Sequence, residues 1–304
     1  MKRISSVGLQ SVLALLVVAY SSYATAEKLE GEELLKKRAK EESKVEDNPF
    51  VIMPHRANYL LPLTYSSDPN DAPFADDLTS GNKDLDNLEA KFQISVKMPL
   101  AENLFGDNGA LFFAYTNQSW WQVYNQRSSA PFRETVHEPE FFLAFKNDWS
   151  LGGFENQYWA VGINHQSNGQ AGTLSRSWNR IYGNMIFDNG PLVFSAQAWW
   201  RIPESEKTST DDATGDDNPD IGKYMGNFEL QGLYGLGEHR FTAMVRNNLR
   251  IHDNKGALQL TYSYPIHKNL RLYMQYFNGY GESLIDYNAH IERLGIGIAL
   301  NDLL

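Results

Sequence analysis

Cysteine, basic charge and long apolar runs are all scarce or absent in this chain of 304 residues. Without cysteine there can be no disulfide, no thiolate zinc site and no cysteine nucleophile. The 27 lysine and arginine residues are outnumbered by 37 aspartate and glutamate residues, giving a net charge of -10. That balance argues against nucleic acid as a partner, because phosphate binding needs a basic surface. A mean hydropathy of -0.45 is too low for a bundle of transmembrane helices.

The one pronounced apolar run lies near the N-terminus and is short. The positive pair Lys2-Arg3 precedes an apolar stretch at 12–19 and the small-x-small sequence Ala24-Thr25-Ala26. This order predicts a secretory signal peptide over 1–26. An uncleaved anchor is the alternative, but the run is shorter than the ~18 residues that a membrane helix needs. No later segment reaches that length, so the mature chain either is soluble or meets lipid as a β-barrel.

Two kinds of sequence follow the predicted signal peptide. Residues 27–49 are dense in charge of both signs, which predicts a solvated periplasmic segment ahead of the fold. Residues 50–304 consist of alternating segments separated by turn-rich stretches, and they are expected to form the barrel domain. At 90–98, for example, apolar residues occupy every second position. Successive side chains of a strand lie on opposite faces, so one face of this strand is wholly apolar.

About twelve such segments can be counted, an even number that is typical of bacterial outer-membrane barrels. A soluble β-sandwich also alternates, so alternation alone leaves both folds open. The signal peptide, the aromatic strand ends and charged residues opposite the apolar face, such as Glu229 and Arg271, favour the barrel. The prediction is an all-β, twelve-stranded antiparallel transmembrane β-barrel. Its strands are expected at 52–67, 87–101, 109–124, 136–148, 155–167, 177–188, 191–202, 220–235, 238–249, 256–266, 268–281 and 288–301.

The lengths of the links give this barrel an orientation. The links after the sixth, eighth and tenth expected strands are short, whereas those at 68–86, 125–135 and 203–219 are long. Outer-membrane barrels have short periplasmic turns and longer outer loops. The junction between the fifth and sixth expected strands should therefore lie near the outer leaflet.

That junction carries polar residues on a face that is otherwise apolar. Trp159, Val161, Ile163, His165 and Ser167 share one parity in the fifth expected strand. The first three are apolar, so this face is expected to meet lipid. Two residues along a strand span roughly 6.6 Å, which lets the imidazole reach the hydroxyl.

A third polar residue, Asn179, shares parity with the apolar Ile181 and Met185 in the next expected strand. Polar groups on a lipid face are costly unless they bond to one another. Mutual hydrogen bonds would also build a nucleophile at Ser167, a general base at His165 and an orienting group at Asn179. The alternative is an ordinary polar outer loop, and parity alone leaves it open.

Longer motifs around these residues resemble a known family. The run His165-Gln-Ser167-Asn-Gly169, followed by Ser175-Arg-Ser-Trp-Asn179-Arg, resembles the site of the outer-membrane phospholipase A family. The similarity covers the chain from about residue 50 to its end. Further matching stretches are Pro131-Phe-Arg-Glu-Thr135, Asp217-Asn-Pro-Asp-Ile221 and Gly279-Tyr-Gly-Glu-Ser-Leu-Ile-Asp-Tyr-Asn288.

The resemblance implies a calcium-dependent enzyme of the bacterial outer membrane, active as a homodimer. It would hydrolyse the sn-1 and sn-2 acyl esters of phospholipids and lysophospholipids. The resemblance implies that His165, Ser167 and Asn179 are the catalytic triad and that the Gly169 N–H binds the oxyanion. It also implies calcium ligands at the dimer interface: the Ser175 hydroxyl, the Gln170 carbonyl and Ser129 of the partner subunit.

The chain departs from the family pattern at two positions. Gln170 stands where arginine is common, which a backbone ligand tolerates. Ala130 stands where a second serine is common, so Ser128 and Ser129 remain alternatives for the partner's ligand. The chain also ends in Leu304 where assembled barrels usually carry an aromatic residue.

Other signals are weaker. Asp216-x-Asn218-x-Asp220 resembles the start of an EF-hand loop, but Pro219 interrupts it and its glycine falls one place late, so a solvated loop is favoured. Gly281-x-Ser283 lacks the last glycine of a nucleophile elbow. Asn117 could face a dimer interface or the lumen. A transport or structural barrel without chemistry remains the competing function.

Overall fold

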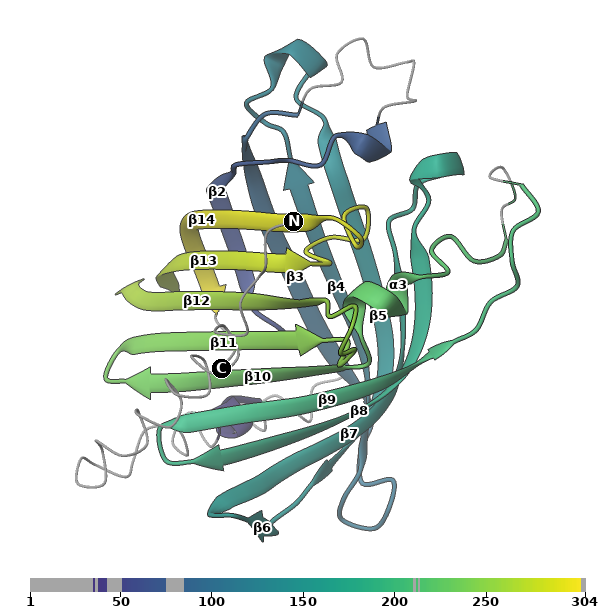
Figure 1. The fold of residues 1–304 in the computed structure, drawn as a ribbon. Helices are drawn as coiled ribbons and strands as arrows, with labels where there is room; N and C mark the ends of the chain where they lie inside the picture. Colours follow the sequence, from purple (N-terminus) through teal and green to yellow (C-terminus); the bar gives the residue numbers. More distant parts are fainter. Residues whose placement is uncertain are drawn as a thin grey trace.

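The computed structural model describes Leu35, 38–42, 51–74, 85–209, Asp212 and 214–301. Within these residues, twelve antiparallel strands close into a barrel because β3 pairs with both β2 and β4, and β14 returns to pair with β2 (Figure 1). Two further strands of two residues each, β1 (Met53–Pro54) and β6 (Ser150–Leu151), pair with the ends of β3 and β7. The twelve are β2 (Asn58–Ser66), β3 (Leu88–Ala101), β4 (Ala110–Trp121), β5 (Phe132–Lys146), β7 (Phe154–Ser167), β8 (Ser177–Asn189), β9 (Leu192–Ile202), β10 (Phe228–Leu236), β11 (His239–Asn247), β12 (Gly256–His267), β13 (Leu270–Tyr280) and β14 (His290–Asn301).

The alternation in the sequence becomes the two faces of the barrel wall. On β7, Val161 and Ile163 are 41% and 54% exposed, whereas Asn164, the next residue along the strand, is 5% exposed. Exposed apolar side chains recur around the outside of the other strands, including Met185, Trp200, Leu260 and Leu294. The predicted apolar outer wall and polar interior are therefore confirmed, as expected of a membrane barrel.

The links divide the barrel into two unlike ends. Two-residue turns at 190–191, 237–238 and 268–269 lie at one end, here called the short-turn end. The link at 168–176 and the described residues of the link at 203–227 lie at the other, here called the long-loop end. No helix among the described residues is long and apolar enough to cross a membrane.

Charged side chains bridge the interior toward the long-loop end. Arg133 donates to Glu89 at 3.1 Å and to Asp286 at 2.5 Å, and Lys91 Nζ lies 3.0 Å from Glu282. These side chains are nearly inaccessible, and each charge has an opposite partner, which offsets the loss of solvation. Glu282 and Asp286 come from the link 281–289, so this link folds into the barrel mouth.

Three strand starts differ from the prediction by four residues or more. The strand expected at 52–67 begins late, as β2 at Asn58, and the two-residue β1 before it pairs separately with β3. The expected strand at 220–235 is wrong at its start, because α3 (Ile221–Met225) occupies that stretch and β10 begins at Phe228. Ile221 and Met225 are buried four residues apart, and Gly226 ends the helix with φ +66°. Tyr224, which falls within the expected strand, therefore belongs to the helix. Strand β5 begins at Phe132 rather than at residue 136, because its first residues continue the ladder with β4 and the charged Arg133 and Glu134 among them are buried.

The N-terminal predictions fall largely outside the described residues. The predicted signal peptide at 1–26 is outside them, as is most of 27–49. The helical residues 38–42 contact the barrel: Arg38 donates to the Pro54 carbonyl at 3.0 Å, and Glu42 pairs with Lys97 at 2.9 Å.

Candidate active site

His165 and Asn179 are paired by the register of β7 and β8. Their Cα atoms are direct cross-strand partners, and the imidazole Nδ1 lies 2.8 Å from Asn179 Oδ1. Both face outward, because Ile163 and Ile181, which lie two residues away in the same strands and share their parity, are among the exposed apolar side chains. The hydrogen bond fixes the Nδ1–H tautomer and leaves Nε2 free to act as a base.

Ser167 is the last residue of β7 and shares its outward face with His165. It is half-buried and stands opposite Ser177 of β8 and His137 of β5. Among the described residues, no hydrogen bond joins Ser167 to His165. A rotation about χ1 can bring two side chains of this spacing together, and catalytic hydrogen bonds often tighten only when substrate binds.

The inward side chains beneath this site are tightly packed. Trp178 is fully buried and donates to Gln166 at 2.6 Å. The Arg180 guanidinium stacks 4.2 Å from the Trp178 ring centre and donates to Asn164 at 2.6 Å. Gly162 lies under the Tyr182 ring, where an added Cβ would meet Tyr182 Cζ at 2.7 Å. The face that carries His165 and Asn179 therefore rests on a rigid layer.

The side chain of Asn168 shapes the link between β7 and β8. Its Nδ2 donates to the Leu174 carbonyl at 2.8 Å, and its Oδ1 accepts from the backbone N–H groups of Gln170 and Arg176 at 3.2 and 2.9 Å. Gly169, next in the chain, has φ +65°, a conformation that favours glycine. This anchoring holds the Gly169 N–H and the Gln170 carbonyl just beyond Ser167.

Asp217 brings the long link 203–227 onto the site. Its Oδ2 accepts hydrogen bonds from Ser175 Oγ at 2.9 Å and Ser177 Oγ at 3.0 Å, and Lys207 forms an ion pair with it. Burial opposes ionisation of Asp217, but the hydrogen bonds from Lys207, Ser175 and Ser177 outweigh it and hold its pKa below the ordinary value of 3.8. In the sequence, Asp217 stands out only as part of a stretch shared with the family, and that stretch gives it no role.

The remaining residues of the weak EF-hand motif are engaged in other contacts. Asp216 pairs with Arg201, and Asp220 accepts from Tyr287 Oη at 2.6 Å. Asn218 is fully buried and accepts from the Ser177 N–H at 3.1 Å. Ser283 is also buried and donates to Asp286 at 2.8 Å. These contacts connect the links 203–227 and 281–289 with each other and with strands β8 and β9.

Ser129 lies away from the His165–Asn179 pair, in the link between β4 and β5. It follows the 3-10 helix η2 (Gln126–Ser128), has φ +59° and is exposed, whereas Ser128 is half-buried. The part of the chain that the structure describes contains no cluster of three or more histidine, aspartate or glutamate residues that could hold a metal.

A polar strip on β4 and β5 continues the site along the outer wall. Tyr115 Oη lies 2.6 Å from His137 Nδ1, and Asn117 Nδ2 lies 3.5 Å from the same atom. Asn117 thus faces outward and not into the lumen. The sequence alone does not place His137 in this strip, because its position beside Ser167 depends on the β5–β7 register.

Comparisons with known proteins agree with this architecture. A family model described as Phospholipase A1 matches residues 35–300. Phospholipase A1 of Klebsiella pneumoniae is 42% identical over 259 residues, covering 84% of this chain and 85% of that protein. The structure of outer membrane phospholipase A from Escherichia coli is 39% identical with a TM-score of 0.76, covering 84% of this chain and 100% of that chain. The Salmonella typhi outer membrane phospholipase, solved as a dimer with bound calcium, is 39% identical with a TM-score of 0.77 and covers 85% of this chain and 95% of that chain.

Proposed function

This chain belongs to the phospholipase A1 family and is an outer-membrane β-barrel, and from that premise we propose that it cleaves phospholipid acyl esters with Ser167, His165 and Asn179. The observation that carries the proposal is the 2.8 Å hydrogen bond between His165 and Asn179 on the outward face of the wall. A pore has no use for a hydrogen-bonded imidazole that faces acyl chains. The site lies at the long-loop end, which we place at the outer leaflet.

The three side chains divide the reaction as in other serine hydrolases. Ser167 Oγ attacks the acyl carbonyl carbon while His165 Nε2 takes its proton. His165 then protonates the leaving alcohol oxygen, and the acyl group remains on Ser167. Water, deprotonated by His165, releases the fatty acid and restores the serine. Asn179 Oδ1 holds the Nδ1–H throughout, without placing a charge beside lipid.

The residues beyond Ser167 supply groups for the oxyanion and for calcium. The Gly169 N–H would donate to the carbonyl oxygen as it becomes negative. Calcium would be held by the Ser175 hydroxyl, the Gln170 carbonyl and Ser129 of the partner subunit; these oxygens suit a hard cation, and Asp217 keeps Ser175 oriented. When bound, calcium adds positive charge near the developing oxyanion. Because Ser129 would come from a second chain, the active form is a homodimer.

The outward placement of the site defines the substrate class. Acyl chains of membrane lipids reach Ser167 along the apolar wall formed by Val161 and Ile163. Both the sn-1 and the sn-2 esters of a phospholipid, and the ester of a lysophospholipid, meet this face. The ion pairs of Arg133 and Lys91 cross the lumen, which disfavours an open transport pore.

Substitution of the nucleophile tests the proposal. Ser167→Ala should abolish calcium-dependent release of fatty acid from phospholipid micelles while the barrel stays folded. Ser195→Ala, on strand β9 two strands away from β7, is the matched control and should retain wild-type activity. Calcium titration alongside chemical crosslinking should show that activity and dimer rise together. Fatty-acid release by Ser167→Ala at the wild-type rate would remove the proposed nucleophile.

A further inference from the structure

Asn179 has a second partner in addition to the imidazole. Its Oδ1 faces His165 Nδ1 at 2.8 Å, and its Nδ2 donates to Glu204 Oε1 at 3.1 Å. We infer that Glu204 is a positioning residue for the proposed catalytic site, on whose function the inference rests. Glu204 holds the carboxamide in the orientation that the imidazole requires.

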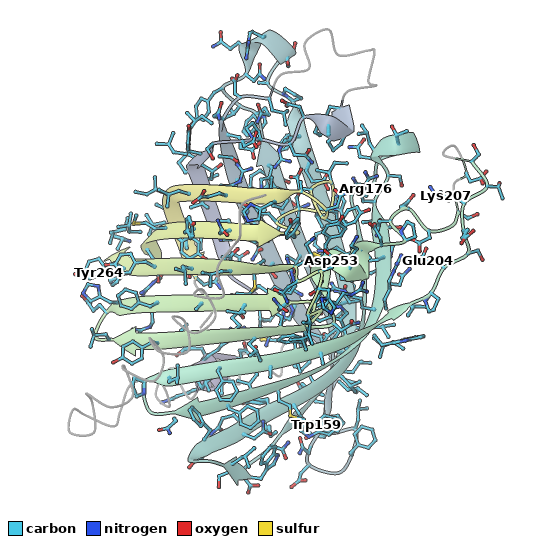
Figure 2. The ribbon with its side chains drawn as sticks, viewed as in Figure 1. Trp159, Arg176, Glu204, Lys207, Asp253 and Tyr264 are labelled. Carbon is cyan, nitrogen blue, oxygen red and sulfur yellow. The ribbon has the colours of Figure 1, made fainter. Side chains whose placement is uncertain are left out.

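The backbone brings Glu204 to this position. Ile202, the last residue of β9, is the cross-strand partner of Asn179. Pro203 follows and has no N–H to continue the ladder, and Glu204 then has the same parity as Ile202 and the exposed Trp200. Glu204 is half-buried, and Figure 2 shows it at the same end of the barrel as Arg176 and Lys207, opposite Tyr264.

A carboxamide needs such a partner because its two ends have similar shape and opposite hydrogen-bonding character. The Oδ1 end accepts and the Nδ2 end donates, whereas an ionised carboxylate only accepts. If Asn179 flipped, its oxygen would face the Glu204 carboxylate and its NH₂ would face the imidazole N–H. Both contacts would then be repulsive, so Glu204 selects the orientation in which Oδ1 accepts from His165.

The placement of the charge also suits catalysis beside a membrane. When His165 takes the serine proton it becomes an imidazolium, which a nearby negative charge stabilises. Glu204, in the link beyond β9, provides that charge, and Asn179 lies between it and the imidazole. The neutral Asn179 remains the group on the wall itself. The three side chains thus form a line from imidazole to carboxamide to carboxylate.

A pair of matched substitutions tests this role in the full-length dimeric enzyme with saturating calcium. Glu204→Gln keeps the size but loses the charge and the strict acceptor character, so kcat on phospholipid micelles should fall about 10-fold with KM unchanged. Glu204→Asp should recover part of the loss. Glu206→Gln, an exposed glutamate two residues along the same link, should behave as wild type.

The Glu204→Gln substitution made in an Asn179→Asp enzyme distinguishes a positioning role of Glu204 from a purely structural one. In Asn179→Asp, residue 179 turns a carboxylate toward Glu204, so adding Glu204→Gln removes a repulsion and should raise kcat. The same substitution therefore lowers activity in one background and raises it in the other. Loss of activity by the same factor in both backgrounds, or wild-type kcat in Glu204→Gln alone, would overturn the inference. Those outcomes leave the proposed function intact as long as Ser167→Ala is inactive.

Discussion

A methyl group added at Gly162 should destabilise the strand that carries His165 and Ser167. The ideal Cβ of an alanine there would lie 2.7 Å from Tyr182 Cζ, 2.8 Å from the Phe141 carbonyl oxygen and 2.8 Å from Phe142 Cβ. The last two belong to the backbone and first side-chain atom of β5, so they cannot move without moving that strand. Overpacking of this kind costs about 1–3 kcal/mol, and we expect Gly162→Ala near the upper end.

A control residue lies one register step away. Gly183 of β8 pairs with Val161 and faces outward, where an added Cβ would meet nothing closer than the Ala160 carbonyl oxygen at 4.0 Å. Gly183→Ala should therefore stabilise the barrel by about 0.5 kcal/mol, because glycine is unfavourable inside a strand. The two substitutions add the same atom to neighbouring strands with opposite expected signs.

Guanidinium unfolding of the barrel in detergent micelles measures both free energies of unfolding. Fatty-acid release measured on the same samples should fall about 10-fold in Gly162→Ala, since a small displacement of β7 misplaces His165 and Ser167 together. If Gly162→Ala unfolds at the same guanidinium concentration as the wild type, the layer beneath the site is not tightly packed at this position. A larger loss in Gly183→Ala than in Gly162→Ala would refute the tight packing equally.

Three further predictions concern the apolar outer wall, Asn179 of the proposed triad and the Asp217 carboxylate that holds the link 203–227 against Ser175. Val161→Arg, near the middle of β7, should cost about 2–4 kcal/mol in lipid, whereas Leu151→Arg at the short-turn end should cost at most about 1 kcal/mol; unfolding in vesicles measures both. Asn179→Ala should lower kcat at least 10²-fold without raising KM, since it frees the imidazole tautomer, and steady-state kinetics on micelles would show this. Because the folded pKa of Asp217 lies below 3.8, its stabilisation is present above about pH 4 and is lost as pH falls through the folded pKa. Hydrogen exchange of the link 203–219 should accordingly be slower in wild type than in Asp217→Asn at pH 7, and this difference should shrink as the pH is lowered below 3.8.

Local pattern was enough to predict the barrel wall. Alternation with a period of two identified all twelve strands and the outward face of His165, Ser167 and Asn179, because lipid on one side makes every second residue apolar. The same reasoning failed at the start of the strand expected over 220–235, where Ile221 and Met225 are buried four residues apart on a short helix. Apolar spacing in so short a stretch does not distinguish a helix from a strand.

The parts of the site that depend on register could not be read from the sequence. His137 lies beside Ser167 only because β5 pairs with β7 in one alignment. Glu204 reaches Asn179 because Ile202 ends β9 opposite it, and Asp217 returns to Ser175 through a long link. Charged residues of the lumen, such as Arg133, gave no periodic signal, since their partners lie on distant strands.

Covalent labelling tests the central claim most directly, because it reports which hydroxyl is activated. A fluorophosphonate probe carrying an alkyl chain should modify the folded, calcium-loaded dimer once per chain, on the peptide that contains Ser167. The reaction should stop in His165→Ala. Labelling of a different residue, or labelling of Ser167 at an unchanged rate in His165→Ala, would contradict a serine activated by the outward-facing imidazole.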